Sequence, residues 1–215
     1  AAMSHQRATA AWAAGKFDDE LVPVSVKQKK GDPIIFDRDE GFRPDATAET
    51  LGQLRAIEKG GVVTAGNASQ QNDAASACLV VSEDKLAELN LDPMAWFVSW
   101  AAAGCEPSRM GIGPVPAVER LFARTGMSWN DIDLVELNEA FAPQVLAVLK
   151  GWGWDDRDRL NVNGSGISLG HPIGATGGRI LANLLRELKR REGRYGLETM
   201  CIGGGQGIAA VFERA

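Results

Sequence analysis

The chain has 215 residues, of which 45% are hydrophobic and 24% are charged, and these fractions are typical of a folded globular protein. They exclude a disordered chain and a collagen-like chain. The 23 lysine and arginine residues against 28 aspartate and glutamate residues give a formal charge of −5. This charge argues against a nucleic-acid-binding protein, so any anionic ligand must be bound by a local basic cluster.

Cysteine and histidine are too few for a disulfide framework or a zinc site. The chain has three cysteines without a Cys-x-x-Cys spacing and two histidines, so we expect no metal and a reducing compartment. The longest weakly polar run, residues 95–105, is about half of what a membrane-spanning helix needs, and no secretory signal opens the chain. We therefore expect no membrane association and a cytoplasmic location. The chain begins directly in a predicted helix, as an internal fragment would.

The first part of the chain predicts short, mixed elements. The alanine-rich residues 3–15 predict a helix, and residues 20–26 predict a short extended segment broken by a proline. Three lysines followed by Gly-Asp-Pro predict an exposed basic loop at residues 27–33. Residues 47–54 can form a short helix, and the apolar residues 76–82 predict a strand.

The second part predicts a layered α/β domain, because strands and helices alternate along it. Leucine and isoleucine residues at helical spacing predict an amphipathic helix over residues 175–191 that packs on the sheet. We place a domain boundary near residue 91. The predicted elements are a strand at 96–104, a helix at 114–126, a strand at 133–138, a helix at 141–152, the helix at 175–191, and two strands at 196–203 and 207–214.

His171 is a candidate general base. It lies in the glycine-rich segment GHPIGATGG at residues 170–178, shortly before a predicted helix. The positive end of a helix macrodipole disfavours the imidazolium ion, and a neutral imidazole can accept a proton. The alternative is a capping or core histidine. The glycine-rich surroundings of the only histidine in the second half favour the catalytic interpretation.

The segment CIGGGQG at residues 201–207 is a candidate oxyanion site. Three consecutive glycines allow positive φ values, so backbone N–H groups can face a ligand oxygen beside Cys201. The alternative is a β-turn next to a buried structural cysteine. A dinucleotide site at residues 164–170 is disfavoured, because no strand directly precedes these glycines and no acidic residue follows at the required distance.

Asn138 opens the segment NEAFA at residues 138–142, at the carboxyl end of a predicted strand. This is the usual position of ligand-binding residues in α/β sheets, and an amide that both donates and accepts can hold a catalytic water. The same residues could also cap a helix. The motif therefore supports a catalytic interpretation only together with the two glycine-rich segments.

These three motifs, in this order, closely resemble the thiolase family, the coenzyme A-dependent acyl-CoA acetyltransferases and 3-ketoacyl-CoA thiolases. Residues 4–24, 37–54, 62–76 and 110–117 also resemble thiolase segments in thiolase order, so the resemblance covers essentially the whole chain. It implies the layered αβαβα thiolase architecture, with this chain as the C-terminal half plus part of the loop domain. Residues 1–70 would be the remainder of the loop domain, residues 71–91 the returning segment of the N-terminal domain, and residues 92–215 the C-terminal domain.

The resemblance also implies roles for single residues. His171 would generate the nucleophilic thiolate and, with a water held by Asn138, stabilise a thioester oxygen. Cys201 would be the acid or base at the α-carbon, and the Gly203 N–H would serve a second oxyanion hole. Acyl-CoA and coenzyme A would be substrates, with no separate cofactor. The expected coenzyme A contacts are Ser69 and Phe141 along the pantetheine and Arg43 along the adenine.

One expected part is missing from this chain. Thiolases acylate a cysteine in a Cys-x-Ser-Gly-type segment of the N-terminal half, and no such segment is present here. Cys78 and Cys105 are interpreted as structural. The acylated cysteine would come from a preceding segment or from a separate polypeptide, unless the chain is an inactive remnant.

The missing half also bears on partners and alternatives. It would leave one face of the sheet uncovered, which implies a partner and a homodimer or homotetramer. A β-ketoacyl synthase is disfavoured, because such enzymes carry two catalytic histidines. A non-catalytic coenzyme A- or acyl-binding partner subunit remains the alternative, disfavoured because His171, Cys201 and Asn138 are all present. SQQND replaces the more usual SGLND after Ala68, and acyl chain length and reaction direction stay open.

Overall fold

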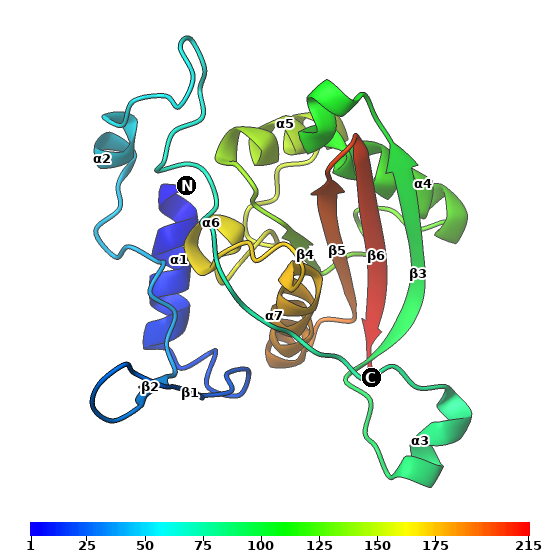
Figure 1. Ribbon diagram of the computed structural model, residues 1–215. Helices are drawn as coiled ribbons and strands as arrows, with labels where there is room; N and C mark the ends of the chain where they lie inside the picture. The colour runs from blue at the N-terminus through cyan, green and yellow to red at the C-terminus, as the bar shows by residue number, and fades with distance from the viewer.

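A mixed four-stranded sheet forms the centre of the C-terminal half (Figure 1). The computed structural model describes all 215 residues. The strand order is β3-β6-β5-β4, with β6 antiparallel to both β3 and β5, and β5 parallel to β4. A parallel bridge between Val135 and Leu160 extends the sheet beyond β4. The strands are β3 (Ala95–Gly104), β4 (Leu134–Leu137), β5 (Tyr195–Ile202) and β6 (Gln206–Arg214).

Helices cover both faces of this sheet, as the predicted layered α/β class requires. On one face, α4 (Pro114–Thr125) and α5 (Ala142–Trp152) share the main hydrophobic core with the sheet, and the short 3-10 helix η1 (Pro107–Ile112) precedes α4. On the other face, α7 (Thr176–Arg191) packs on β4 and β5. The predicted amphipathic pattern of α7 is confirmed, because Ile180, Leu184 and Leu188 are fully buried.

The N-terminal part lies beside α7 and α6 (Gly166–Leu169), and α1 (Ala2–Ala13) packs against α6. A second, small core joins the two parts, in which Trp12 stacks on Phe42 with ring centroids 5.9 Å apart and Leu169 of α6 is buried. The remaining elements are the antiparallel pair β1 (Val24–Val26) and β2 (Ile34–Phe36), and the short helices α2 (Ala48–Gly52) and α3 (Glu83–Leu89).

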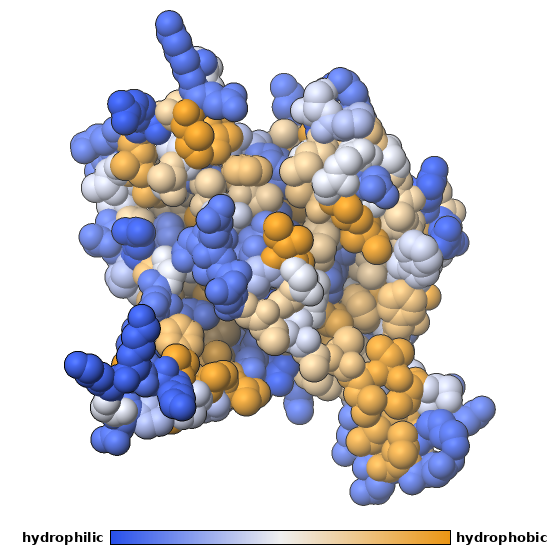
Figure 2. Space-filling model, in the orientation of Figure 1, coloured by the Kyte–Doolittle hydropathy of each residue, from blue (hydrophilic) through white to orange (hydrophobic).

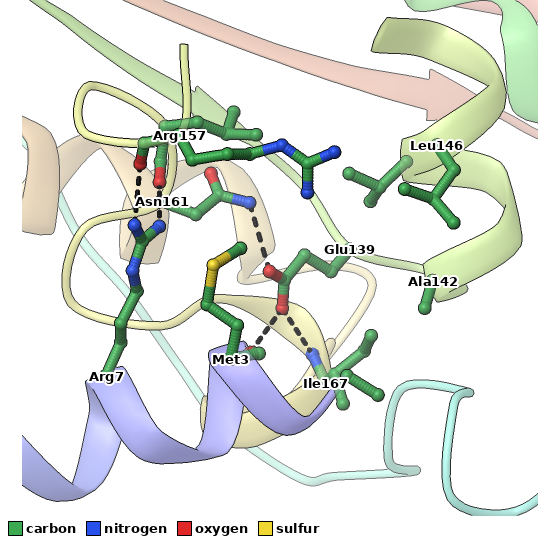
Figure 3. A pocket seen from close by; sticks show the side chains of 12 residues that line it. Met3, Arg7, Glu139, Ala142, Leu146, Arg157, Asn161 and Ile167 are labelled. Carbon is green, nitrogen blue, oxygen red and sulfur yellow. Dashed lines mark hydrogen bonds between the residues drawn. The ribbon is translucent and has the colours of Figure 1, made fainter. Parts of the chain in front are cut away.

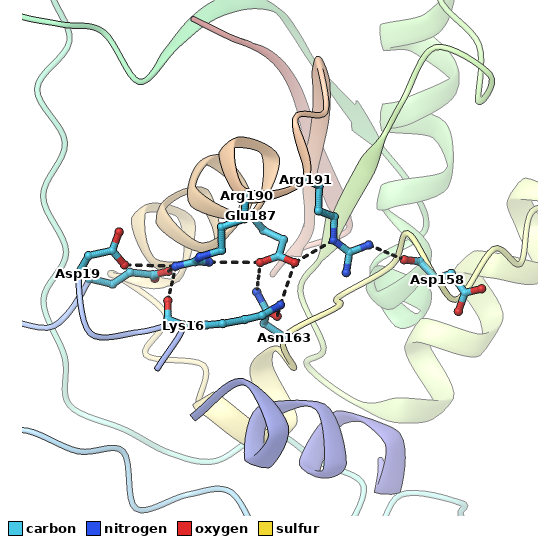
Figure 4. Close-up of polar contacts among 8 residues, drawn as sticks. Lys16, Asp19, Asp158, Asn163, Glu187, Arg190 and Arg191 are labelled. Carbon is cyan, nitrogen blue, oxygen red and sulfur yellow. Dashed lines mark hydrogen bonds and ion pairs between the residues drawn. The ribbon is translucent and has the colours of Figure 1, made fainter. Parts of the chain in front are cut away.

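A buried carboxylate on α7 fastens the N-terminal part to the sheet domain (Figure 4). The Glu187 side chain is 4% exposed and accepts from Lys16 Nζ at 2.9 Å and from Asn163 Nδ2 at 3.1 Å. Arg190 and Arg191, one turn further along α7, also pair with it. Burial raises the pKa of Glu187, but the hydrogen bonds outweigh this effect and lower it to about 2. The carboxylate is therefore ionised and fully paired.

The strand predicted at residues 76–82 does not form, and this prediction is wrong. Residues 71–82 belong to no helix or strand, and Cys78, Leu79 and Val80 are all exposed. A strand needs a neighbour to satisfy its backbone hydrogen bonds, and no strand of this chain lies beside these residues. An apolar composition alone does not create a strand.

The α7 face of the sheet is covered only in part. Ala101 and Ala103 of β3 are buried in the core beneath α4, so the alternation of a strand places Trp100 on the opposite face. Trp100 is 47% exposed and Phe97 is 56% exposed, because α7 packs on β4 and β5 and leaves β3 free. β3 is also an edge strand, whose Trp100 and Ala102 carbonyls accept hydrogen bonds from Arg124 and Arg120 of α4.

Further hydrophobic side chains gather on the surface of the N-terminal part. Figure 2 shows them over α3 and over the β1–β2 pair, where the basic residues 27–30 lie close by. The exposed residues at these places are Leu89, Val24, Val26, Ile34, Ile35 and Phe36. None of the helices combines the length and the hydropathy that a membrane crossing requires.

Candidate active site

The parallel pairing of β4 and β5 brings Asn138 and Cys201 to the same edge of the sheet. Leu137, the last residue of β4, lies opposite Thr199, and the Asn138 N–H donates to the Thr199 carbonyl at 3.0 Å. Cys201 follows two residues later, near the end of β5. The predicted position of Asn138 directly after a strand is thus confirmed, and so is the strand beside Cys201.

The Asn138 side chain has unused hydrogen-bonding capacity. The residue is fully buried, and neither Oδ1 nor Nδ2 has a hydrogen-bond partner among the protein groups. A Cβ atom at Gly166 would lie 2.8 Å from Asn138 Oδ1 and 2.6 Å from the Glu139 carbonyl, so only glycine fits against this amide. Leaving a buried amide unpaired costs about 1–3 kcal/mol, which is typical of a group kept for a ligand or a water.

His171 lies in the loop between α6 and α7, at the amino end of α7 as predicted. Its Nδ1 is 2.7 Å from Thr176 Oγ1, and the Thr176 hydroxyl donates to the Pro172 carbonyl at 3.0 Å. We assign the single hydroxyl proton to the Pro172 bond, so Nδ1 carries the proton that Thr176 accepts. Nε2 is then left as an unprotonated acceptor, which is the form that a general base requires.

The electrostatics also favour a neutral imidazole. Burial lowers the pKa of His171, and the positive charge of Arg179 lowers it further. The direction agrees with the prediction, although the effect of Arg179, in the first turn of α7, was not predicted. At neutral pH the ring is therefore uncharged and can accept a proton.

Two of the three glycines in the turn after Cys201 adopt the positive φ that the sequence allows, and Gly203 does not. Gly204 and Gly205 have φ values of 87° and 88°, a region that glycine enters without strain. The Cys105 N–H donates to the Gly205 carbonyl at 2.7 Å and holds the turn, while the Cα of Gly203 faces open space. Burial raises the pKa of the Cys201 thiol, so this sulfur keeps its proton at neutral pH.

Ser69 and Phe141 lie together, beside Asn138. The Ser69 N–H donates to the Ala140 carbonyl at 2.9 Å, and Ala68 forms a β-bridge with Phe141. Arg43 lies elsewhere, next to α1, where its backbone N–H donates to His5 Nδ1 at 3.2 Å. The structure thus groups Ser69 and Phe141 with Asn138, and it does not group Arg43 with them.

Glu139 belongs to a separate polar network that the sequence did not reveal (Figure 3). Its carboxylate accepts from Ser4 Oγ at 2.5 Å, from the Ile167 N–H at 3.2 Å and from Asn161 Nδ2 at 3.2 Å. The carboxylate lines a small cavity of about 70 Å³ between α1 and α5. Neither His171 nor Cys201 borders this cavity, so Glu139 fixes the loop that carries Asn138 rather than taking part in a site there.

Two further residues near His171 escaped the sequence analysis. Thr176 orients the ring, and Asn72 contacts the His171 backbone. Both lie inside segments named above, Thr176 in GHPIGATGG and Asn72 in SQQND, but neither segment indicates by itself that these two side chains contact His171. No group of three or more histidine, cysteine, aspartate or glutamate side chains is placed to hold a metal ion.

Comparisons with known proteins agree with this geometry. The C-terminal domain of thiolases matches residues 91–214, and the N-terminal domain of thiolases matches residues 1–84. The acetyl-CoA acetyltransferase of Thiocystis violacea is 52% identical over 215 residues, which are 100% of this chain and 54% of that protein. The beta-ketothiolase BktB of Cupriavidus necator is 53% identical over 213 residues, which are 98% of this chain and 54% of that protein.

Solved structures give the same result. The acetyl-CoA acetyltransferase of Bacillus anthracis superposes with a TM-score of 0.93 at 44% identity, over 99% of this chain and 54% of the other. The human mitochondrial 3-ketoacyl-CoA thiolase in complex with CoA superposes with a TM-score of 0.89 at 44% identity, over 100% of this chain and 53% of the other. The chain therefore spans about half the length of the relatives that it matches.

Proposed function

The chain belongs to the thiolase family, and we propose that it forms the acid–base half of an acyl-CoA C-acyltransferase. The enzyme would transfer acyl groups between coenzyme A thioesters, by thiolysis of a 3-ketoacyl-CoA or by condensation of two acyl-CoA molecules. The observation that carries the proposal is the His171 ring, which is neutral, oriented through Nδ1 and free at Nε2. His5 is also buried and hydrogen-bonded at Nδ1, but its Nδ1 accepts from the Arg43 N–H, so its Nε2 carries the proton and cannot act as a base.

In the thiolysis direction, His171 Nε2 takes the proton of the attacking cysteine, which lies outside this chain. The cysteine sulfur bonds to the 3-keto carbon, the bond between the α-carbon and that carbon breaks, and the α-carbon takes the proton of the Cys201 thiol. Free coenzyme A then attacks the acyl-cysteine. Its thiol proton passes to the Cys201 sulfur, and the released cysteine sulfur recovers its proton from His171.

Hydrogen-bond donors complete the proposed site. The unpaired amide of Asn138 suits a water that, with His171, stabilises a developing oxyanion, and the Gly203 N–H suits the second oxyanion. One such donor contributes about 10²–10³ in rate, and a positioned acid or base about 10²–10⁴. Ser69 and Phe141 would line the pantetheine beside Asn138, and Arg43 would lie along the adenine of the coenzyme A substrate.

The proposal includes the parts that this chain lacks. A segment or chain with the acylated cysteine would cover the exposed side chains of β3, within a homodimer or homotetramer in the cytoplasm. Residues 1–70 would belong to the loop domain, residues 71–91 would return to the N-terminal domain, and residues 92–215 would form the C-terminal domain. The uncovered half of the α7 face and the short length relative to known thiolases support this arrangement.

The test combines this chain with the part of the Thiocystis violacea relative that it does not match. We expect the combined protein to cleave acetoacetyl-CoA with free coenzyme A, which is measured as a loss of absorbance. We also expect an acetyl-enzyme, which is detected by its intact mass. His171→Ala should abolish acylation by acetyl-CoA, whereas Cys201→Ala should keep acylation by acetyl-CoA and block both the formation and the cleavage of the carbon–carbon bond. Equal loss of both steps in the two variants would contradict the assigned roles. Coenzyme A binding without any acylation would favour a non-catalytic partner subunit instead.

A further inference from the structure

The backbone N–H of His171 has its partner outside its own loop. Because α6 ends at Leu169 and α7 begins at Thr176, neither helix provides an acceptor for this N–H. It donates instead to Asn72 Oδ1 at 3.2 Å, a side chain that lies 99 residues earlier in the chain. The ring of His171 is thus oriented by Thr176, and its main chain is held by Asn72.

Gly170 is shaped for this contact. It has a φ of 99°, and a Cβ atom at this position would lie 2.5 Å from Asn72 Oδ1 and 2.8 Å from its Cγ. The amide of Asn72 therefore lies directly against the backbone of the residue before His171. The requirement for glycine at position 170 has two causes, the positive φ and the approach of Asn72.

Asn72 belongs to a segment, residues 69–76, that we call the strap. At one end, the Ser69 N–H donates to the Ala140 carbonyl at 2.9 Å, next to the loop that carries Asn138. At the other end, Ser76 Oγ donates to the Ala175 carbonyl at 2.9 Å, at the start of α7. The strap contains no helix or strand, so these few contacts determine its position.

A second side chain fixes the strap between its ends. Gln70 Nε2 donates to the Gly41 carbonyl at 2.9 Å and to the Ile167 carbonyl of α6 at 3.1 Å. A Cβ atom at Gly41 would lie 2.3 Å from the Gln70 amide, so the glutamine lies tightly against that loop. The strap is thus connected to both of the walls that carry candidate catalytic groups.

We propose that Asn72 is a positioning residue for His171, and that the strap sets the placement of His171 relative to Asn138. The catalytic part of this inference rests on the proposed function, whereas the positioning part concerns the imidazole alone. Without Asn72, the loop from Gly170 to Ala175 loses the contact that holds its main chain at His171, and we expect the ring to gain exposure to water. A general base that is present in several orientations is productive only in one of them.

The experiment compares Asn72→Ala and Asn72→Asp with Asn130→Ala as a control. Asn72 is exposed and belongs to none of the three hydrophobic clusters, so its substitution removes no core contact. Asn130 is also exposed, and it is the backbone N–H of Asn130, not its side chain, that donates to Ser128 Oγ, which makes it a matched control. Asn72→Asp keeps an oxygen that can accept the His171 N–H.

The first readout is the pKa of His171. It is measured in the assembled protein from the NMR signals of the carbon-bound imidazole protons as a function of pH. The chain has only one other histidine, His5, which serves as an internal reference. We expect Asn72→Ala to raise the pKa of His171 towards its ordinary value and to leave that of His5 unchanged. A His171 pKa that stays the same in Asn72→Ala and in Asn130→Ala would overturn the positioning role.

The second readout is kinetic, on the same assembled protein. We expect Asn72→Ala to lower kcat about tenfold with a smaller change in KM, since one lost hydrogen bond corresponds to about one factor of ten. Asn72→Asp should retain most of kcat, and Asn130→Ala should retain all of it. Equal losses in Asn72→Ala and Asn72→Asp would overturn the inference. If the unchanged protein is inactive, the proposed function fails, and the NMR readout still decides the positioning role.

Discussion

Glu136 and Glu198 lie directly opposite each other in the parallel pair β4–β5, on the side of the sheet that faces α7. Burial raises the pKa of Glu198 to about 8 and that of Glu136 well above its ordinary value, while Arg179 of α7 opposes both shifts. Two buried carboxyl groups in register therefore share a single nearby guanidinium. The arrangement favours protonated carboxyl groups at neutral pH.

This pair predicts how the stability of the protein depends on pH. Because the folded-state pKa of Glu198 lies above its unfolded value of about 4.5, the folded state binds the proton more tightly. Stability should fall as the pH rises from about 4.5 to about 8, by at most about 1.4 kcal/mol per pH unit from this group. Glu198→Gln should flatten the dependence, which urea unfolding at several pH values can measure. An unchanged slope in the variant would refute the assignment.

Glu187 predicts the opposite behaviour at low pH. Its pKa of about 2 lies below the unfolded value, so its contribution is fully present above about pH 4.5 and is lost as the pH falls through about 2. A shift of this size corresponds to about 3 kcal/mol. Glu187→Gln should therefore lose about this amount at pH 7 and unfold with a smaller acid dependence. Glu213→Gln, which removes an exposed ion pair with Arg194, is the control and should cost less than about 1 kcal/mol.

Thr176 offers a test of the histidine tautomer. Thr176→Val removes the oxygen that accepts from Nδ1 of His171 and preserves the shape of a fully buried side chain. We expect a shift of the tautomer away from the Nδ1–H form, read from the imidazole nitrogen chemical shifts, and a fall in kcat of about tenfold or more. Thr176→Ser keeps the hydroxyl and should restore both properties. A valine variant with the original nitrogen shifts would show that Thr176 does not select the tautomer.

Substitution of Asn138 by an apolar residue should raise the stability of the protein and lower its activity. Asn138→Leu replaces a fully buried amide that has no hydrogen-bond partner with an apolar side chain of similar size. We expect the free energy of unfolding to rise by about 1 kcal/mol and the activity to fall about 10²–10³-fold. Denaturant unfolding and thiolysis assays on the same sample measure both changes. A variant that loses stability and keeps activity would contradict the proposed role of the amide.

Some elements of this fold could be predicted from the sequence, and others could not. Local periodicity located the long helix 176–191 within a residue at its start, and the alternation of elements predicted the sheet and its flanking helices. Four short elements were missed. β2, η1 and α6 are a few residues long and leave no periodic pattern, and the seven residues of α3 span only two turns. The strand predicted at residues 76–82 does not form, because these residues have the apolar composition of a strand but no neighbouring strand to pair with.

Within the candidate site, the local positions of the motif residues, at a strand end and in loops, were predictable, and their long-range contacts were not. His171, Cys201 and Asn138 stand in distinctive glycine-rich or strand-end surroundings. By contrast, the contacts of Asn72 with His171 and of Ser4 with Glu139 join residues 99 and 135 positions apart. Such pairings depend on how the chain packs in three dimensions, and no local pattern in one sequence encodes them.

The arginines on α4 have a consequence for how this protein can associate. An edge strand normally offers its free carbonyls to a strand of another molecule, which is a common start of aggregation. In β3 the carbonyls of Trp100 and Ala102 already accept hydrogen bonds from Arg124 and Arg120, which disfavours pairing with a strand of another molecule there. The exposed tryptophans of β3 can still be covered through their side chains. Assembly at this edge is thereby steered away from fibre growth and towards a specific, side-chain-mediated contact.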